Sequence, residues 1–109
     1  MIKYVCQVFI LFYTITMKYK PEDRLQKQLA ESFLKLSHSQ EVLNYLRDLM
    51  TPAEIREFSK RLEIARLLQK GKQSYLEISE QLGVSTTTVT RVAQWLNNGC
   101  EGYKTVLKK

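Results

Sequence analysis

The side chains best suited to chemistry in this sequence are hydroxyl, amide and guanidinium groups that lie together near its end. They are Ser85, Thr86, Thr87, Thr90, Arg91 and Gln94. None of them is acidic, and each can hydrogen-bond to a base edge or a phosphate oxygen. The alternatives are a threonine-rich solvated face or a surface for protein contacts. Consecutive Ser and Thr residues lower helix propensity, however, and would be a poor choice for a face that is only solvated. The pattern therefore favours contact with duplex DNA.

Two short helices joined by a tight turn are expected to present this group. Ser74 can cap a helix that continues from Tyr75 to Leu82, and Gly83 can take the left-handed conformation that ends it. Ser85 can cap a second helix from Thr86 to Leu96. The side chains expected to pack between them are five apolar residues and one small serine, namely Ile78, Ser79, Leu82, Val84, Val89 and Val92. Two helices with a short glycine-containing turn are typical of a helix-turn-helix.

Three further helices are expected before this motif and one after it, which makes the fold all-α with about six helices. The first starts at Pro21 and covers about four turns, because apolar residues recur at helical spacing as far as Leu36. Ser39 can cap the second. The last is expected at residues 100–107, and its side chains expected to face inward are Tyr103, Val106 and Leu107. The helix-turn-helix is then formed by the fourth and fifth helices.

The third helix has the clearest boundaries. Thr51 can cap it, Pro52 stands at its first position and Glu54 completes a capping box, while Gly71 is expected to end it. Its main apolar stripe consists of Ile55, Phe58, Leu62, Ala65 and Leu68, which Ile64 and Leu67 widen. A stripe this wide exceeds what one neighbouring helix needs. We therefore expect the helix to lie in the middle of the fold or at a subunit interface.

The composition is that of one folded domain and gives no sign of an enzyme. The chain has 109 residues, 44% of them hydrophobic, and a net charge of +6, which suits a polyanionic partner. Neither of its two cysteines, Cys6 and Cys100, has a metal-ligand partner nearby, and its one histidine, His38, lies in a polar joint. We find no paired nucleophile and base, no paired carboxylates and no glycine-rich phosphate loop. We therefore expect no catalysis, no metal and no cofactor.

Residues 1–16 differ in kind from the rest of the chain. From Tyr4 to Ile15, ten of twelve residues are apolar or aromatic. This run is too short to span a bilayer as a helix and lacks the small-residue cleavage site of a signal peptide. Since Met17 reads as a second start, we expect residues 1–16 to be an extension outside the native protein and residues 17–109 to be the domain. An arm that packs on a partner and, less favoured, a membrane anchor are the alternatives.

The segment from Leu49 to Arg91 resembles the Trp repressor family, with matching spacing and no gap. Its sequence is LMTPAEIREFSKRLEIARLLQKGKQSYLEISEQLGVSTTTVTR. The most specific marks are Thr51-Pro52, Glu54, Arg61, Leu67-Leu68, Ser74, Leu82-Gly83 and the run from Thr88 to Arg91. The resemblance implies an intertwined homodimer in which Thr86, Thr87 and Thr90 face base edges. Two such recognition helices, about one turn of DNA apart, imply a roughly palindromic operator.

The resemblance also implies a small-molecule pocket, since the two arginines that hold tryptophan in the family match Arg61 and Arg91. The residues assigned to this effector pocket are Thr51, Arg61, Arg91, Val92 and Trp95. Val92 and Trp95 stand where the family has a glycine and a small serine. An isopropyl group and an indole are large additions to a pocket sized for one indole ring. We therefore expect that free tryptophan is not the effector, and the identity of any effector stays open.

Together these patterns predict a sequence-specific regulator of transcription, a repressor, that binds double-stranded DNA as a cytoplasmic homodimer. Two other functions stay open. One is a regulator gated by a different small anion at Arg61 and Arg91, which would show a ligand-dependent shift in melting temperature. The other is a helix-turn-helix used for protein contacts, which would show no salt-dependent binding to DNA.

Overall fold

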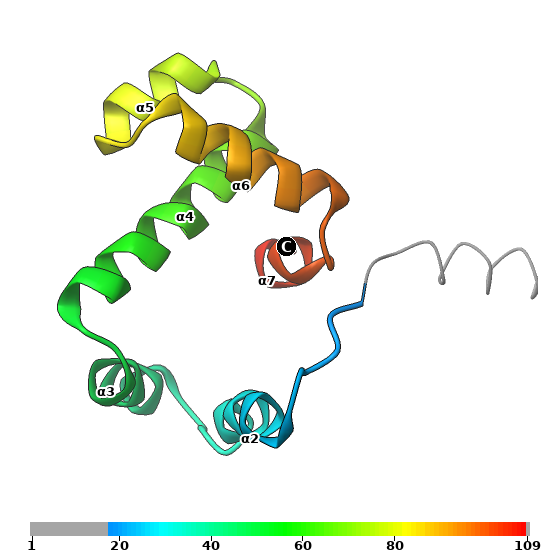
Figure 1. Cartoon of the computed structure of the whole chain (residues 1–109). Helices are drawn as coiled ribbons and strands as arrows, with labels where there is room; N and C mark the ends of the chain where they lie inside the picture. Colours follow the sequence, from blue (N-terminus) through cyan, green and yellow to red (C-terminus); the bar gives the residue numbers. More distant parts are fainter. Residues whose placement is uncertain (1–17, 109) are drawn as a thin grey trace, which may run out of the picture. The chain divides into compact units, whose positions relative to one another are not determined.

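The computed structural model describes residues 18–108, and this range contains helices and no strand (Figure 1). The helices are α2 (Arg24–Phe33), α3 (Ser39–Leu49), α4 (Pro52–Lys70), α5 (Tyr75–Leu82), α6 (Thr86–Asn98) and α7 (Gly102–Leu107). The prediction of an all-α fold with six helices is confirmed for this range. The extension predicted at residues 1–16 lies outside the described residues. None of the helices described is both long and apolar enough to cross a membrane.

The described chain divides into two compact units. One comprises residues 20–60, with α2, α3 and the first half of α4. The other comprises residues 61–108, with the second half of α4 and with α5, α6 and α7, and it also includes residues 18 and 19. The second unit holds the core. Its main cluster of buried apolar side chains is Ile64, Ala65, Leu67, Ile78, Val89 and Val92, with Leu68, Leu82, Val84, Tyr103 and Leu107 packed against them. The helix-turn-helix therefore rests on the end of α4.

The start of α2 differs from the prediction because a stronger cap, Asp23, lies two residues after Pro21. Asp23 accepts a hydrogen bond from the backbone N–H of Gln26 at 2.9 Å, and the helix begins after it rather than at Pro21. At the other end α2 stops at Phe33. The next three backbone N–H groups bond to carbonyls three residues back, which is tighter than an α-helix. The helix is thus shorter than the four turns predicted.

The cap predicted at Ser39 is wrong by one residue. His38 occupies the N-cap position of α3 and makes no cap hydrogen bond with its side chain. Its imidazole Nε2 instead lies 2.9 Å from a carboxylate oxygen of Glu41. Ser39 is the first helical residue.

The boundaries predicted for α4 are confirmed. The hydroxyl of Thr51 accepts a hydrogen bond from the backbone N–H of Glu54 at 3.2 Å. Gly71 ends the helix with a φ of 70°, in the left-handed region that favours glycine, and its N–H bonds to the carbonyls of Leu67 and Leu68. α4 is therefore fixed by local hydrogen bonds at both ends.

The face of α4 that is buried is not the one expected from its main stripe. Ile64 and Leu67, expected only to widen the stripe, belong to the core, whereas Phe58 and Leu62 are exposed. Ala65 is the main-stripe residue that is fully buried. The reason is geometric: only the last turns of α4 have α5 and α6 to pack against, so burial is greatest at that end of the helix.

The last helix starts later than predicted and faces inward only in part. Glu101 has a φ of 69° at the N-cap of α7, so the helix begins at Gly102 and not at Cys100. Tyr103 and Leu107 pack against the core as expected. Val106 is 69% exposed, so its predicted inward orientation is wrong for a single copy.

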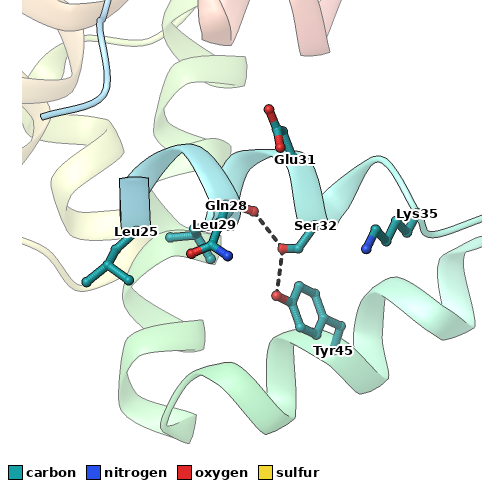
Figure 2. A pocket seen from close by; sticks show the side chains of 7 residues that line it. All are labelled: Leu25, Gln28, Leu29, Glu31, Ser32, Lys35 and Tyr45. Carbon is teal, nitrogen blue, oxygen red and sulfur yellow. Dashed lines mark hydrogen bonds between the residues drawn. The ribbon is translucent and has the colours of Figure 1, made fainter. Parts of the chain in front are cut away.

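The unit of residues 20–60 has no buried residue. α2 and α3 are joined by a hydrogen bond between the hydroxyls of Ser32 and Tyr45, 2.6 Å apart (Figure 2). An edge-to-face contact of Phe33 and Tyr45 joins them as well. Beside this contact lies an open depression of about 530 Å³, lined by Leu25, Gln28, Leu29, Glu31, Ser32, Lys35 and Tyr45. The large apolar side chains left exposed on this unit are Leu25, Leu29, Leu34, Leu43, Leu49 and Phe58.

Candidate nucleic-acid interface

The first helix of the motif, α5, is fixed by a reciprocal capping box. The hydroxyl of Ser74 accepts a hydrogen bond from the N–H of Glu77 at 3.1 Å, and the N–H of Ser74 donates to the carboxylate of Glu77 at 3.4 Å. Two N–H groups that the helix leaves unpaired are satisfied in this way. The cap predicted at Ser74 is confirmed.

The turn between α5 and α6 depends on one left-handed residue. Gly83 has φ 65° and ψ 40°, and a Cβ added to it would meet nothing within 4 Å. Glycine is therefore favoured here by backbone conformation and not by lack of space. The N–H of Val84 closes the turn on the carbonyl of Ser79 at 3.0 Å. Ser79 is itself nearly buried, as expected for a small side chain between two helices.

α6 then starts at the predicted cap and continues two residues further than predicted. The hydroxyl of Ser85 accepts from the N–H of Thr88 at 3.1 Å, and the helix ends at Asn98 before Gly99. One face of the helix is buried, through Val89, Val92, Ala93 and Leu96. The opposite face of the helix is exposed.

All six residues predicted to contact DNA are exposed. They are Ser85, Thr86, Thr87, Thr90, Arg91 and Gln94. Four of them, Thr86, Thr87, Arg91 and Gln94, form no side-chain hydrogen bond to another residue within the range 18–108. α6 brings these residues together on one surface and has no acidic side chain. Its N-terminus also directs N–H groups outward, which favours an anion such as phosphate.

The charged face of α4 contributes less free positive charge than its sequence suggests. Arg66 Nε donates to a carboxylate oxygen of Glu63 at 2.7 Å, and a second guanidinium nitrogen contacts the other oxygen. The hydrogen bond from Arg66 lowers the pKa of the Glu63 carboxyl, against the opposing effect of desolvation. The same hydrogen bond raises the pKa of Arg66. Both groups are ionised at physiological pH, and their opposite charges cancel.

Two surface features were not found from the sequence. Lys70 and Lys72 are exposed at the turn that leads into α5, where they can meet phosphates, and the Lys-Gly-Lys run was the available signal. No run of residues in the sequence indicated the depression on α2 and α3, because residues from two separate helices line it.

Comparison with known proteins identifies the group to which this arrangement belongs. The sequence model of the family described as Trp repressor protein matches residues 24–109. The chain belongs to the Trp repressor family. The members of this family are helix-turn-helix, DNA-binding regulators of transcription and not enzymes, as the sequence predicted.

Individual relatives agree with this assignment. An uncharacterized protein of Bacillus subtilis, YerC, is 38% identical over 82 residues, which cover 75% of this chain and 78% of YerC. A Trp operon repressor homolog of Vibrio parahaemolyticus is 36% identical over 92 residues, covering 84% and 89% of the two chains. The crystal structure of a TrpR-like protein from Eubacterium eligens matches with a TM-score of 0.73 at 34% identity, covering 80% of this chain and 89% of that one.

The residues predicted to form the family's effector pocket differ in how exposed they are and in the unit to which they belong. Val92 is 3% exposed and belongs to the core, while Trp95, three residues later, is 46% exposed. Arg91 is exposed and Arg61 half-buried. Thr51 belongs to the other unit, where its hydroxyl caps α4. A pocket made by these five residues stays a prediction.

Proposed function

We propose that this member of the Trp repressor family is a repressor that binds a roughly palindromic DNA operator as a homodimer, with α6 as the recognition helix. The observation that carries the proposal is the exposed polar face of α6, held by the caps at Ser74 and Ser85 and by the left-handed turn at Gly83. A recognition helix needs side chains that can reach base edges and a backbone that fixes their direction. α6 has both.

The support for a homodimer lies in residues 20–60. This unit buries no side chain within one copy and leaves six large apolar side chains exposed, among them Leu43, which is 58% exposed. A protein of this size gains stability by covering such surface, at about 25 cal/mol per Å². A second copy of the chain would cover it and would also occupy the depression beside Tyr45.

The residues proposed to contact DNA are the six exposed polar residues of the motif, Ser85, Thr86, Thr87, Thr90, Arg91 and Gln94. Residues at the start of a recognition helix reach base edges, while charged residues and N–H groups hold phosphates. A two-fold dimer would present two copies of this surface to successive turns of the major groove, which is why the operator should be roughly palindromic. Binding to an operator in the chromosome would place the protein in the cytoplasm.

We also propose that free tryptophan does not control this repressor. Trp95 is bulky and half-exposed beside Arg91 on α6, and Val92 fills space that a glycine would leave open. Calorimetric titration with L-tryptophan tests this proposal. We expect no heat of binding at micromolar ligand, and a micromolar dissociation constant would contradict us.

Selection of bound sequences from a random pool of duplex DNA tests the proposed function as a whole. We expect enrichment of an inverted repeat, and an affinity that falls steeply with salt as phosphate counterions are released. Arg91→Ala should weaken binding to the enriched operator about tenfold, by loss of a charge-assisted contact. A pool that stays unenriched at low salt would refute DNA binding and favour a protein-interaction module.

A further inference from the structure

The hydroxyl groups along α6 differ in whether they are free to read DNA. The hydroxyl of Thr90 donates to the carbonyl oxygen of Thr86 one turn earlier, at 2.9 Å. The hydroxyls of Ser85 and Thr88 lie 2.9 Å apart and bond to each other. Thr86 and Thr87 keep hydroxyls that bond to no other residue within the described range 18–108. The threonines of one helix therefore offer different chemistry to a partner.

Thr90 offers its methyl group rather than a hydrogen-bond donor. A threonine hydroxyl has a single proton, and in Thr90 that proton is used inside the helix. Its Cβ carries only two heavy-atom substituents besides the backbone, so turning the hydroxyl back toward Thr86 leaves the methyl for an apolar contact, while the hydroxyl oxygen can only accept a hydrogen bond. Threonine in a helix divides between two χ1 rotamers, and the hydrogen bond to Thr86 favours the one seen here. The residue is exposed on the outward face of α6.

One base presents a matching group in the major groove. Thymine carries a C5-methyl there, and threonine methyl groups are among the apolar groups that contact it. We propose that Thr90 is a specificity-determining residue that recognises a thymine in each half of the operator through contact between the two methyl groups. This inference rests on the proposed function, because it concerns the DNA that α6 would bind.

The test compares two substitutions that remove different parts of Thr90. Thr90→Ser removes the methyl group and keeps the hydroxyl, whereas Thr90→Val keeps the shape and removes the hydroxyl. Both are measured by fluorescence anisotropy on the operator enriched from the random pool, and on versions in which each thymine in turn is replaced by deoxyuridine, which lacks the C5-methyl. Melting curves establish that each variant is folded.

We expect one thymine per half-site to respond. Replacing it by deoxyuridine should weaken wild-type binding about fourfold for one half-site and roughly fifteenfold for both, which corresponds to about one buried methyl group each. Thr90→Ser should lose a similar amount on the thymine operator and become insensitive to deoxyuridine. Thr90→Val should bind like the wild type.

Thr105 supplies a matched control, because its hydroxyl makes the same hydrogen bond, to the carbonyl of Glu101 at 2.9 Å, on α7. Thr105→Ser and Thr105→Val should leave DNA affinity unchanged. A larger loss for Thr90→Val than for Thr90→Ser would overturn the inference, and so would wild-type binding that no deoxyuridine changes, while the proposed function would stand. If the wild type binds no duplex at all, the proposed function fails and the inference with it.

Discussion

The two units of this chain differ in how much apolar surface they bury within a single copy. Residues 61–108 bury Ile64, Ile78 and Val89 completely, in a core that fixes the helix-turn-helix. Residues 20–60 contain comparable apolar side chains and bury none of them. One unit therefore has a core of its own, whereas the other leaves its apolar side chains exposed in a single copy.

This difference suggests a division of roles. A recognition surface must be held rigidly, and α6 is held by buried side chains and by hydrogen-bonded caps. A dimerisation surface must be apolar and exposed in the single copy, and α2 and α3 carry exposed apolar side chains of this kind. The substitutions below test whether the two units respond as these roles require.

The largest effect is expected in the core of the second unit. Ile78→Ala should lower the free energy of unfolding by about 2–5 kcal/mol, because it removes a fully buried side chain and leaves a cavity. Urea denaturation measures the change. Leu76→Ala, on the same helix but 58% exposed, is the control and should change it by about 0.5 kcal/mol or less. Equal effects would mean that α5 is not packed as described.

The next effect is expected on the exposed face of the first unit. Leu43→Asp changes a side chain that is 58% exposed, so it should cost little in a single copy. If a second copy covers this face, a buried carboxylate should raise the dimer dissociation constant roughly 100-fold. Sedimentation analysis measures this constant. Asn44→Asp adds the same charge at the next, exposed position and should leave it unchanged. A Leu43→Asp dimer as tight as the wild type would contradict the proposed interface.

A smaller effect is expected at the turn of the motif. Gly83→Ala should lower the free energy of unfolding by about 1 kcal/mol, since alanine is strained at a φ of 65° even though space is available. Gly102→Ala is the control, because Gly102 also has open space but begins a helix, where alanine is favoured. Gly102→Ala should be neutral or stabilising in thermal melts. A neutral Gly83→Ala would show that the turn is not left-handed.

The smallest effect is expected at the ion pair of α4. The pKa of Glu63 is lowered from its ordinary value of 4.5 in the folded protein, so the pair stabilises the fold above that value. The contribution is lost as the pH falls through the lowered pKa. Glu63→Gln should therefore reduce the melting temperature slightly at pH 7, and the difference from the wild type should vanish at strongly acidic pH. A difference that grows toward acid pH would contradict this assignment.

The features of this fold that could be predicted from the sequence are those decided by neighbouring residues. The caps at Ser74 and Ser85 and the glycine turns at Gly71 and Gly83 form between residues a few positions apart. Such hydrogen bonds depend little on the rest of the chain, so their residue types identify them. The exposed polar face of α6 could also be predicted from the types of its neighbouring residues.

The faces that α4 and α7 bury could not be predicted in this way. Ile64 and Phe58 are both apolar and both on α4, yet only Ile64 is buried, because only the last turns of α4 have α5 and α6 to pack against. Val106 is exposed although its spacing suits an inward face. Helical spacing shows which residues share a face but not which neighbour, or which copy of the chain, covers it. An effector pocket is equally hard to predict from the sequence, because its residues would come from separate helices.

The central claim is that two copies of α6, joined by a symmetric dimer, read two half-sites on one side of the DNA. The most direct measurement compares binding to the selected operator with binding to the same operator carrying five extra base pairs between its half-sites. Five base pairs turn one half-site by about half a helical turn, to the opposite side of the duplex. We expect affinity to fall about 100-fold or more, nearly to the level of a single half-site. Unchanged affinity would contradict the account.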